Sequence, residues 1–175
     1  NRDKILINSK PTWITIPVQK KGNYNEIIKN IKIDYKNNWT NKLFKILEHN
    51  YRKAPCFDFH YEFIKKIISD DHEYLIDLNM KLIKYVMDYF NIKNETIFSS
   101  NLHIKEKKSF KILEILKRTN ATNYITGTGS KNYLDENLLS QNNFKTEYLK
   151  NNNNIDENLS ILHYLFNSNK KDLNV

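Results

Sequence analysis

The sequence predicts an α/β fold in which helices flank a mainly parallel sheet, and three patterns along its 175 residues predict it. Apolar and polar residues alternate near the N-terminus, which favours a β-hairpin. The middle of the chain, residues 39–90, changes to the spacing of amphipathic helices. The C-terminal half alternates short apolar runs with helical segments, which predicts a βαβαβ arrangement with right-handed crossovers.

The N-terminal hairpin is predicted from two alternating runs that flank a turn containing proline. Lys4–Ile7 and Trp13–Val18 form the two strands, and Asn8–Pro11 forms the turn. A further short run at 31–35 continues the alternation. These segments therefore predict a hairpin or a small meander.

Three helices are predicted in the middle of the chain. They run over 39–51, 59–68 and about 73–90. Pro55 ends the first, because proline cannot continue a helix. Asp70 and Glu73 have the spacing of a capping box, so this acidic segment predicts a helix start rather than a metal site.

The C-terminal half is expected to supply most of the parallel sheet. Strands are predicted at 96–98, 124–126 and 144–149, and helices at 110–116 and 132–139. Residues 151–154 form a polar loop, and 159–167 a last amphipathic helix. A chain of this length suits one core, so we expect residues 1–175 to form a single domain.

The net charge and the number of cysteines limit which partners and which cellular compartment we expect. The formal net charge is +8, but lysines are spread along nearly every segment and only three arginines occur. Because nucleic-acid readers concentrate arginine and basic runs, this distribution disfavours nucleic acid as a partner. Cys56 is the single cysteine, and no run of about 18 apolar residues occurs. We therefore expect a cytoplasmic protein without a membrane span.

A glycine-containing loop follows the predicted strand at 124–126. Gly127, Gly129, Ser130 and Lys131 lie where a strand's carboxyl end meets a helix start, a place that favours anions. Backbone N–H groups, the Ser130 hydroxyl and the Lys131 ammonium are the predicted phosphate ligands. A glycine turn with Ser130 as the helix N-cap is the competing interpretation. No Walker or GxGxxG motif is present.

A second polar cluster follows the predicted strand at 96–98. Ser99, Ser100 and His103 are expected to share a cleft with the glycine loop, with His103 as the candidate general base and the serines as ligand-binding groups. A surface histidine is the competing interpretation for His103. The five histidines form no HxxxH or HExxH pair, so we predict no metal site.

Taken in order, several segments resemble the WbqC-like family of bacterial proteins. They are Asn1–Ile5, Trp13–Val18, Trp39 through Phe57, Ser99–Leu102, Ala121–Asp135 and Leu159–Asn167. The order and spacing of these segments carry the resemblance, which covers nearly the whole chain. Three features depart from the family pattern: His163 replaces an aspartate, Ser130 replaces a glycine, and the loop at 151–154 replaces a longer stretch.

The resemblance implies a transferase that modifies sugars in O-antigen or other surface-polysaccharide synthesis, with glycine or another aminoacyl group as the group transferred. An activated small-molecule donor or a sugar nucleotide is the implied partner, and no cofactor is specified. Arg2 is then a candidate ligand for a carboxylate or phosphate. A basic nucleic-acid-binding module without catalysis is the alternative function.

Family members usually carry a further segment ahead of the motif that corresponds to Asn1–Ile5. This sequence begins at Asn1, so we expect that segment to be missing from it. An unpaired strand edge or an apolar patch is then expected near residues 5–18.

Overall fold

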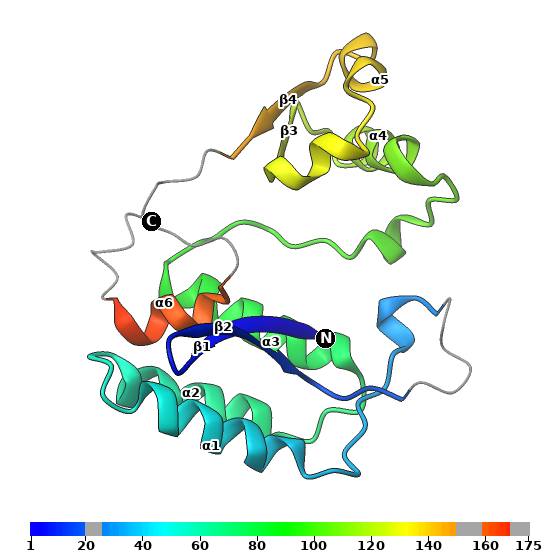
Figure 1. The fold of residues 1–175 in the computed structure, drawn as a ribbon. Coiled ribbons are helices and arrows are strands. Elements are labelled where there is room, and N and C mark those ends of the chain that lie inside the picture. Colours follow the sequence, from blue (N-terminus) through cyan, green and yellow to red (C-terminus); the bar gives the residue numbers. More distant parts are fainter. Residues whose placement is uncertain (20–25, 150–158, 169–175) are drawn as a thin grey trace. The chain divides into compact units, whose positions relative to one another are not determined.

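The computed structural model describes residues 1–19, 26–149 and 159–168, and it combines helices with small sheets (Figure 1). The chain divides into two compact units. The first comprises Asn1–Lys93 and Asp156–Val175, and the second comprises Asn94–Ile155. Each unit has its own cluster of buried apolar side chains.

The predicted N-terminal hairpin is confirmed in the first unit. Strands β1 (Arg2–Ile7) and β2 (Lys10–Thr15) pair antiparallel, with Lys4 opposite Trp13. Asn8 and Ser9 form the two-residue turn with positive φ, the backbone conformation that right-twisted hairpins favour. The alternating run at 31–35 makes only isolated bridges, and the short helix η1 (Ile28–Asn30) precedes it.

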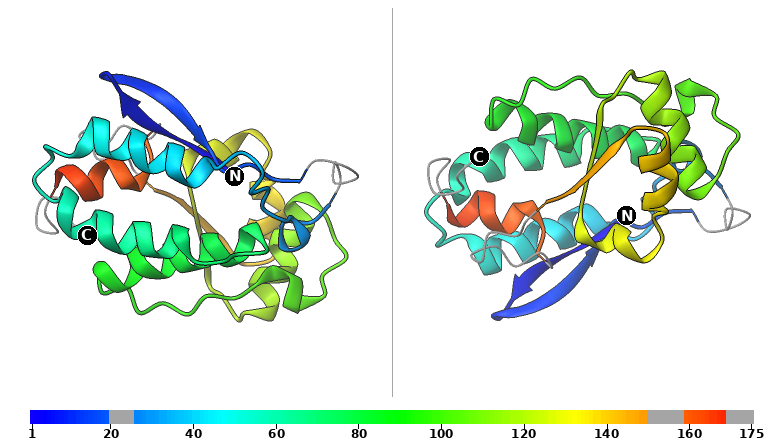
Figure 2. Two further views of the ribbon diagram at one scale, coloured as in Figure 1. Left: turned by 90° about the horizontal axis from the view of Figure 1, so that it is seen from below. Right: turned by 90° about the horizontal axis from the view of Figure 1, so that it is seen from above.

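The predicted helical middle is also confirmed. It consists of α1 (Trp39–Tyr51), α2 (Phe57–Ser69) and α3 (Leu75–Tyr89). The predicted last helix is α6 (Ile161–Asn167), which contacts α2 and β1 (Figure 2). Ile5, Leu47, Ile64, Leu78 and Phe166 are fully buried where these elements meet, so the chain's two ends share one core.

The acidic segment before α3 does not cap that helix. Tyr74 is the N-cap residue and its side chain makes no capping hydrogen bond. Asp70 instead ends α2 and pairs with Lys81, while Glu73 pairs with Lys32. The predicted capping box was therefore wrong, because long-range lysines compete for both carboxylates.

The second unit contains one parallel strand pair and the helices around it. Its elements are η2 (Ser99–Leu102), α4 (Lys108–Arg118), β3 (Asn123–Thr126), η3 (Thr128–Asn132), α5 (Glu136–Gln141) and β4 (Lys145–Tyr148). Strands β3 and β4 run parallel, with Thr126 opposite Tyr148. Leu113, Leu116 and Leu139 are buried between the strands and the helices.

The mainly parallel sheet and the βαβαβ half are not confirmed. The described residues form two two-stranded sheets, one antiparallel and one parallel. The predicted strand at 96–98 was wrong: Ile97 and Phe98 are 51% and 43% exposed, and a short run that buries little gains little from pairing. The predicted helix at 132–139 begins only at Glu136, because η3 occupies the preceding turn. The polar loop at 151–154 lies outside the described residues.

Candidate functional site

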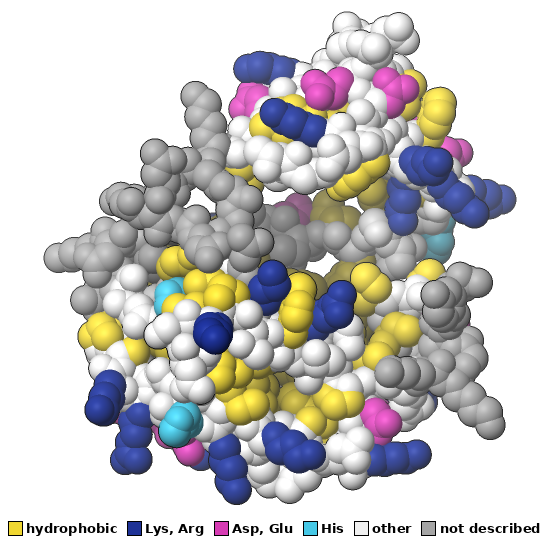
Figure 3. Space-filling view, viewed as in Figure 1, with side chains coloured by type: hydrophobic (Ala, Val, Ile, Leu, Met, Phe, Trp, Pro, Cys, Tyr) yellow, Lys and Arg dark blue, Asp and Glu magenta, His cyan; other side chains and the backbone are white. Residues whose placement is uncertain are grey.

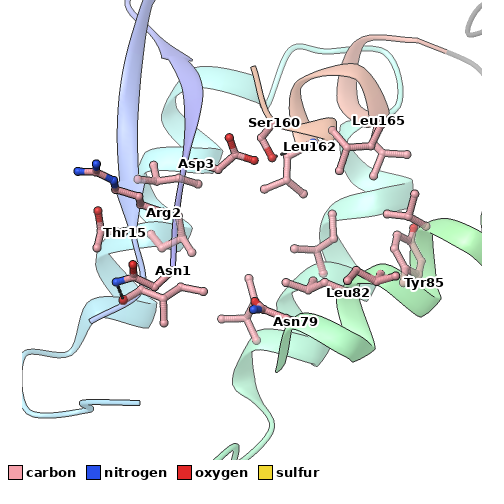
Figure 4. Close-up of a pocket in the computed structure, with 18 residues that line it drawn as sticks. Asn1, Arg2, Asp3, Thr15, Asn79, Leu82, Tyr85, Ser160, Leu162 and Leu165 are labelled. Carbon is pink, nitrogen blue, oxygen red and sulfur yellow. Dashed lines mark hydrogen bonds between the residues drawn. The ribbon is translucent and has the colours of Figure 1, made fainter. Parts of the chain in front are cut away.

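A cavity of about 370 Å³ opens in the first unit between the hairpin and the helices (Figure 4). Most of its wall is aliphatic. The apolar lining residues are Ile14, Ile16, Leu43, Ile64, Ile68, Leu82, Ile83, Val86, Ile161, Leu162 and Leu165. A cavity of this size with mostly apolar walls is typical of small-molecule sites.

Three of the polar side chains around this cavity come from three different elements. Asp3 comes from β1, Asn79 from α3, and Ser160 from the residue that caps α6 (Figure 4). The Ser160 N–H donates to the Lys4 carbonyl at 2.7 Å, which ties the start of α6 to β1. This bond holds Ser160 beside Asp3, although 157 positions separate them in sequence (160 − 3).

Strand alternation separates the charges of β1. Asp3 points toward Ser160, whereas Arg2 points away from the cavity (Figure 4). The Arg2 guanidinium lies 4.7 Å from the ring centroid of Trp13, and the Lys4 ammonium lies 4.9 Å from the same ring. The candidate anion ligand Arg2 therefore contributes to the cavity rim while its charged group contacts an exposed tryptophan.

Tyr85 joins the cavity wall to a buried histidine. Its hydroxyl lies 2.7 Å from Nδ1 of His60, which is fully buried on α2. Burial lowers the pKa of His60 and raises the pKa of Tyr85 to about 12, so both groups are neutral near pH 7. Within the described part of the chain, His60 Nε2 has no hydrogen-bond partner.

The glycine loop lies at the carboxyl end of β3, where the sequence predicts it. Neither Gly127 nor Gly129 has positive φ, so the backbone does not require glycine at these positions. A Cβ atom built at either residue meets no atom within 4 Å. Neither backbone strain nor packing explains these glycines, and the space beside both is open.

The residues after the glycines make local contacts. The Ser130 hydroxyl is buried and donates to the Gly127 carbonyl at 2.9 Å, while the N-cap of α5 is Asp135. The Lys131 ammonium lies 4.6 Å from the ring centroid of Tyr148 at the end of β4. The competing interpretation of Ser130 as the helix N-cap was therefore wrong, because the chain makes a 3-10 turn before the helix begins.

The second polar cluster does not share a cleft with the glycine loop. Ser99 and Ser100 lie in η2, which is held at the C-terminal end of α4 because the Arg118 guanidinium donates to the Leu102 carbonyl. At the opposite end of α4, the Ser109 hydroxyl accepts the Asp135 N–H at 2.9 Å, next to the glycine loop. Helix α4 has 11 residues, so these ends are about 15 Å apart.

The remaining predicted site residues divide between the units. His103 is exposed and has a φ of 50° at the end of η2 in the second unit, and Arg2 belongs to the first. Across residues 1–19, 26–149 and 159–168, no three His, Cys, Asp or Glu side chains gather in a way that could hold a metal ion. No helix in these ranges has the length and apolar character to cross a membrane.

Sequence reasoning singled out Arg2 at the cavity rim but missed the other polar residues that line the cavity. The alternation of β1 places Asp3 on the face opposite Arg2, but no local pattern connects it to Asn79, Tyr85 or Ser160. They surround one cavity only because α3 and α6 pack near the hairpin in the folded unit.

Comparison with known proteins gives a family for the chain. The sequence model of the WbqC-like protein family matches residues 1–175. An uncharacterized protein of Mycobacterium tuberculosis is 27% identical over 142 residues, which cover 81% of this chain and 61% of that protein. The chain thus matches less than two-thirds of that relative's length. No solved structure gives a significant match.

Proposed function

The chain belongs to the WbqC-like protein family, and from this premise we propose that it is a transferase that modifies a sugar in the synthesis of O-antigen or another surface polysaccharide. The proposed group transferred is glycine or another aminoacyl group, from an activated donor that carries phosphate. In this step the acceptor nitrogen or oxygen attacks the acyl carbon, the bond to the leaving oxygen breaks, and a base takes the acceptor proton.

The open space beside Gly127 and Gly129 is the observation that supports this proposal best. Both residues follow β3 at the carboxyl end of a parallel strand pair, a position where α/β units bind phosphate-bearing ligands. The first amides of the η3 turn have no partner inside that helix and are donors for an anion. The exposed Lys131 supplies a positive charge two residues after Gly129.

We assign the other predicted residues roles within this proposal. We assign the exposed Ser99, Ser100 and His103 to the acceptor, with His103 as the base. Because they lie about 15 Å from the glycine loop along α4, the donor must reach them from a phosphate bound at that loop. Arg2 is assigned as a ligand for a carboxylate or phosphate. We also propose that both units belong to a single domain of the family, because the family match spans them. The lone Cys56 fits a cytoplasmic location.

Calorimetric titration with uridine diphosphate and a uridine-diphosphate sugar tests the phosphate-binding role. Gly129→Val should abolish binding, because its side chain fills the space that the ligand phosphate needs. Lys131→Glu should weaken binding about fivefold, as expected for a partly exposed charge contact. Both variants should stay folded, since no neighbour clashes at residue 129 and Lys131 is exposed.

The matched control is Lys105→Glu, an exposed lysine in the same unit but outside the loop. Its charge reversal should leave the affinity unchanged. Equal affinities for the wild type and both loop variants would show that the loop only turns the chain.

The alternative nucleic-acid function has less support from the surface. Lysine and arginine side chains are dispersed among apolar and neutral polar side chains on the face shown in Figure 3. A nucleic-acid affinity that falls steeply with salt concentration would favour this alternative over the transferase.

A further inference from the structure

The cavity of the first unit is lined by polar groups that have few partners in the described part of the chain. Within the described residues, the Asp3 carboxylate accepts one hydrogen bond, from the Lys4 N–H at 2.8 Å, and forms no salt bridge. The half-buried Asn79 amide has no hydrogen-bond partner in the same ranges, although it lies on the cavity wall (Figure 4). In ligand sites, a few polar groups within mostly apolar walls fix the orientation of the ligand and provide specificity.

The cations nearest to Asp3 in sequence do not neutralise it. Arg2 and Lys4 project to the other face of β1, where both lie over the Trp13 ring. Asp3 therefore presents a negative charge to a cavity whose other walls are mainly aliphatic. A ligand that complements both features has a cationic or hydrogen-donating head and an apolar body.

The other polar groups around the cavity fit the same ligand. The Ser160 hydroxyl oxygen accepts the Leu162 N–H at 3.4 Å, and its second lone pair can accept a hydrogen bond from an ammonium group. The Tyr85 hydroxyl is engaged with His60, so its ring contributes mainly apolar wall. Among the described residues that line the cavity, Asp3 is the only one with an acidic side chain.

We propose that this cavity binds an amphipathic primary amine, with its ammonium group at Asp3 and its aliphatic body between α3, α6 and β2. The Asn79 carbonyl oxygen is placed as a second acceptor for a polar substituent of the ligand. The site lies wholly in the first unit, and it does not depend on the glycine loop of the second.

Three probes of equal length and different head group test the proposal: hexylamine, hexanol and hexanoate. Calorimetry or ligand-observed NMR at pH 7 should show hexylammonium binding about two- to fivefold more tightly than hexanol, the range for a partly exposed ion pair. Hexanoate should bind more weakly than hexanol, because its charge is repelled by Asp3. Within the series butylamine, pentylamine and hexylamine, affinity should rise about fourfold per methylene.

Asp3→Asn should remove the preference for the amine over the alcohol and leave the chain-length dependence intact. Asp3 is exposed, so this change should not unfold the unit. Asp58→Asn, at an exposed carboxylate of α2 outside the cavity, should leave both the amine preference and the chain-length dependence unchanged. Val86→Phe should instead reduce the chain-length dependence by filling the cavity.

Two outcomes would overturn the proposal. One is equal binding of hexylamine and hexanoate by the wild type. The other is undetectable hexylamine binding at millimolar concentration in a folded protein.

Discussion

The Tyr85 hydroxyl lies 2.7 Å from Nδ1 of the fully buried His60, and this contact connects the cavity wall on α3 to the buried face of α2. Burial disfavours the charged form of His60, which lowers its pKa in the folded protein. The pair is therefore a neutral hydrogen bond between two helices, and its contribution to stability depends on pH.

The first prediction concerns that pH dependence. The folded pKa of His60 is below its ordinary value of about 6.5, so unfolding takes up a proton between the two values. The stabilisation from neutral His60 is fully present above about pH 6.5 and is lost as the pH falls toward the folded pKa. Urea unfolding of wild type and His60→Phe at pH 7.5 and pH 5 should show a smaller loss on acidification in the variant.

His49→Gln is the control for this experiment, because His49 is an exposed residue of α1. It should keep the wild-type pH dependence. An identical acid loss in His60→Phe and wild type would contradict the prediction.

The second prediction concerns the hydrogen bond itself. Tyr85→Phe leaves the buried His60 Nδ1 without its partner and should lower the free energy of unfolding by about 1–3 kcal/mol. The double variant with His60→Phe should lose less than the sum of the two single changes, with a coupling of about 0.5–3 kcal/mol. Denaturant unfolding of all four proteins measures the cycle, and strict additivity would show that the pair does not interact.

The third prediction locates the start of α5. The Asp135 carboxylate accepts the Leu138 N–H at 3.0 Å, so Asp135→Ala should lower the stability of the second unit by about 0.5–2 kcal/mol. Asp135→Asn should restore most of it, because asparagine is also a good N-cap. Hydrogen exchange of the α5 amides measures the stability of both variants. Equal stabilities of the alanine and asparagine variants would show that the Asp135 side chain does not stabilise the start of α5.

The fourth prediction uses the two tryptophans, both of which lie in the first unit. Trp13 is 52% exposed beside Arg2 and Lys4, whereas Trp39 at the start of α1 is 5% exposed. Acrylamide should quench the emission of Trp39→Phe strongly and that of Trp13→Phe weakly. Equally weak quenching of both variants would show that the Trp13 side of the hairpin is covered in solution.

Local pattern in the sequence was enough for the elements that bury one continuous face. Alternation around Asn8 and Ser9 predicted the hairpin, and helical spacing predicted α1, α2 and α3 to within a few residues. The order of short motifs also predicted the family, whose model matches the whole chain. The hairpin and the helices depend on neighbours only a few positions apart, and the family motifs are short segments in a fixed order, so the sequence displays both directly.

Pattern failed where contacts between distant residues decide the outcome. Thr96–Phe98 has the composition of a strand, but no strand among the described residues pairs with it. Asp70 has capping spacing but pairs with Lys81 instead. Ser99 and Gly127 both follow apolar runs, yet helix α4 keeps their segments at its opposite ends.

The cavity was decided by tertiary structure alone. Asp3, Asn79 and Ser160 are far apart in the sequence, and each is unremarkable in its own segment. They come together because the hairpin, α3 and α6 bury their apolar faces against one core, and this packing places the polar residues of the three elements around one cavity. The sequence by itself determined the hairpin, the helices α1 to α3 and the family, whereas the free energy of burying their apolar faces together determined which polar residues meet.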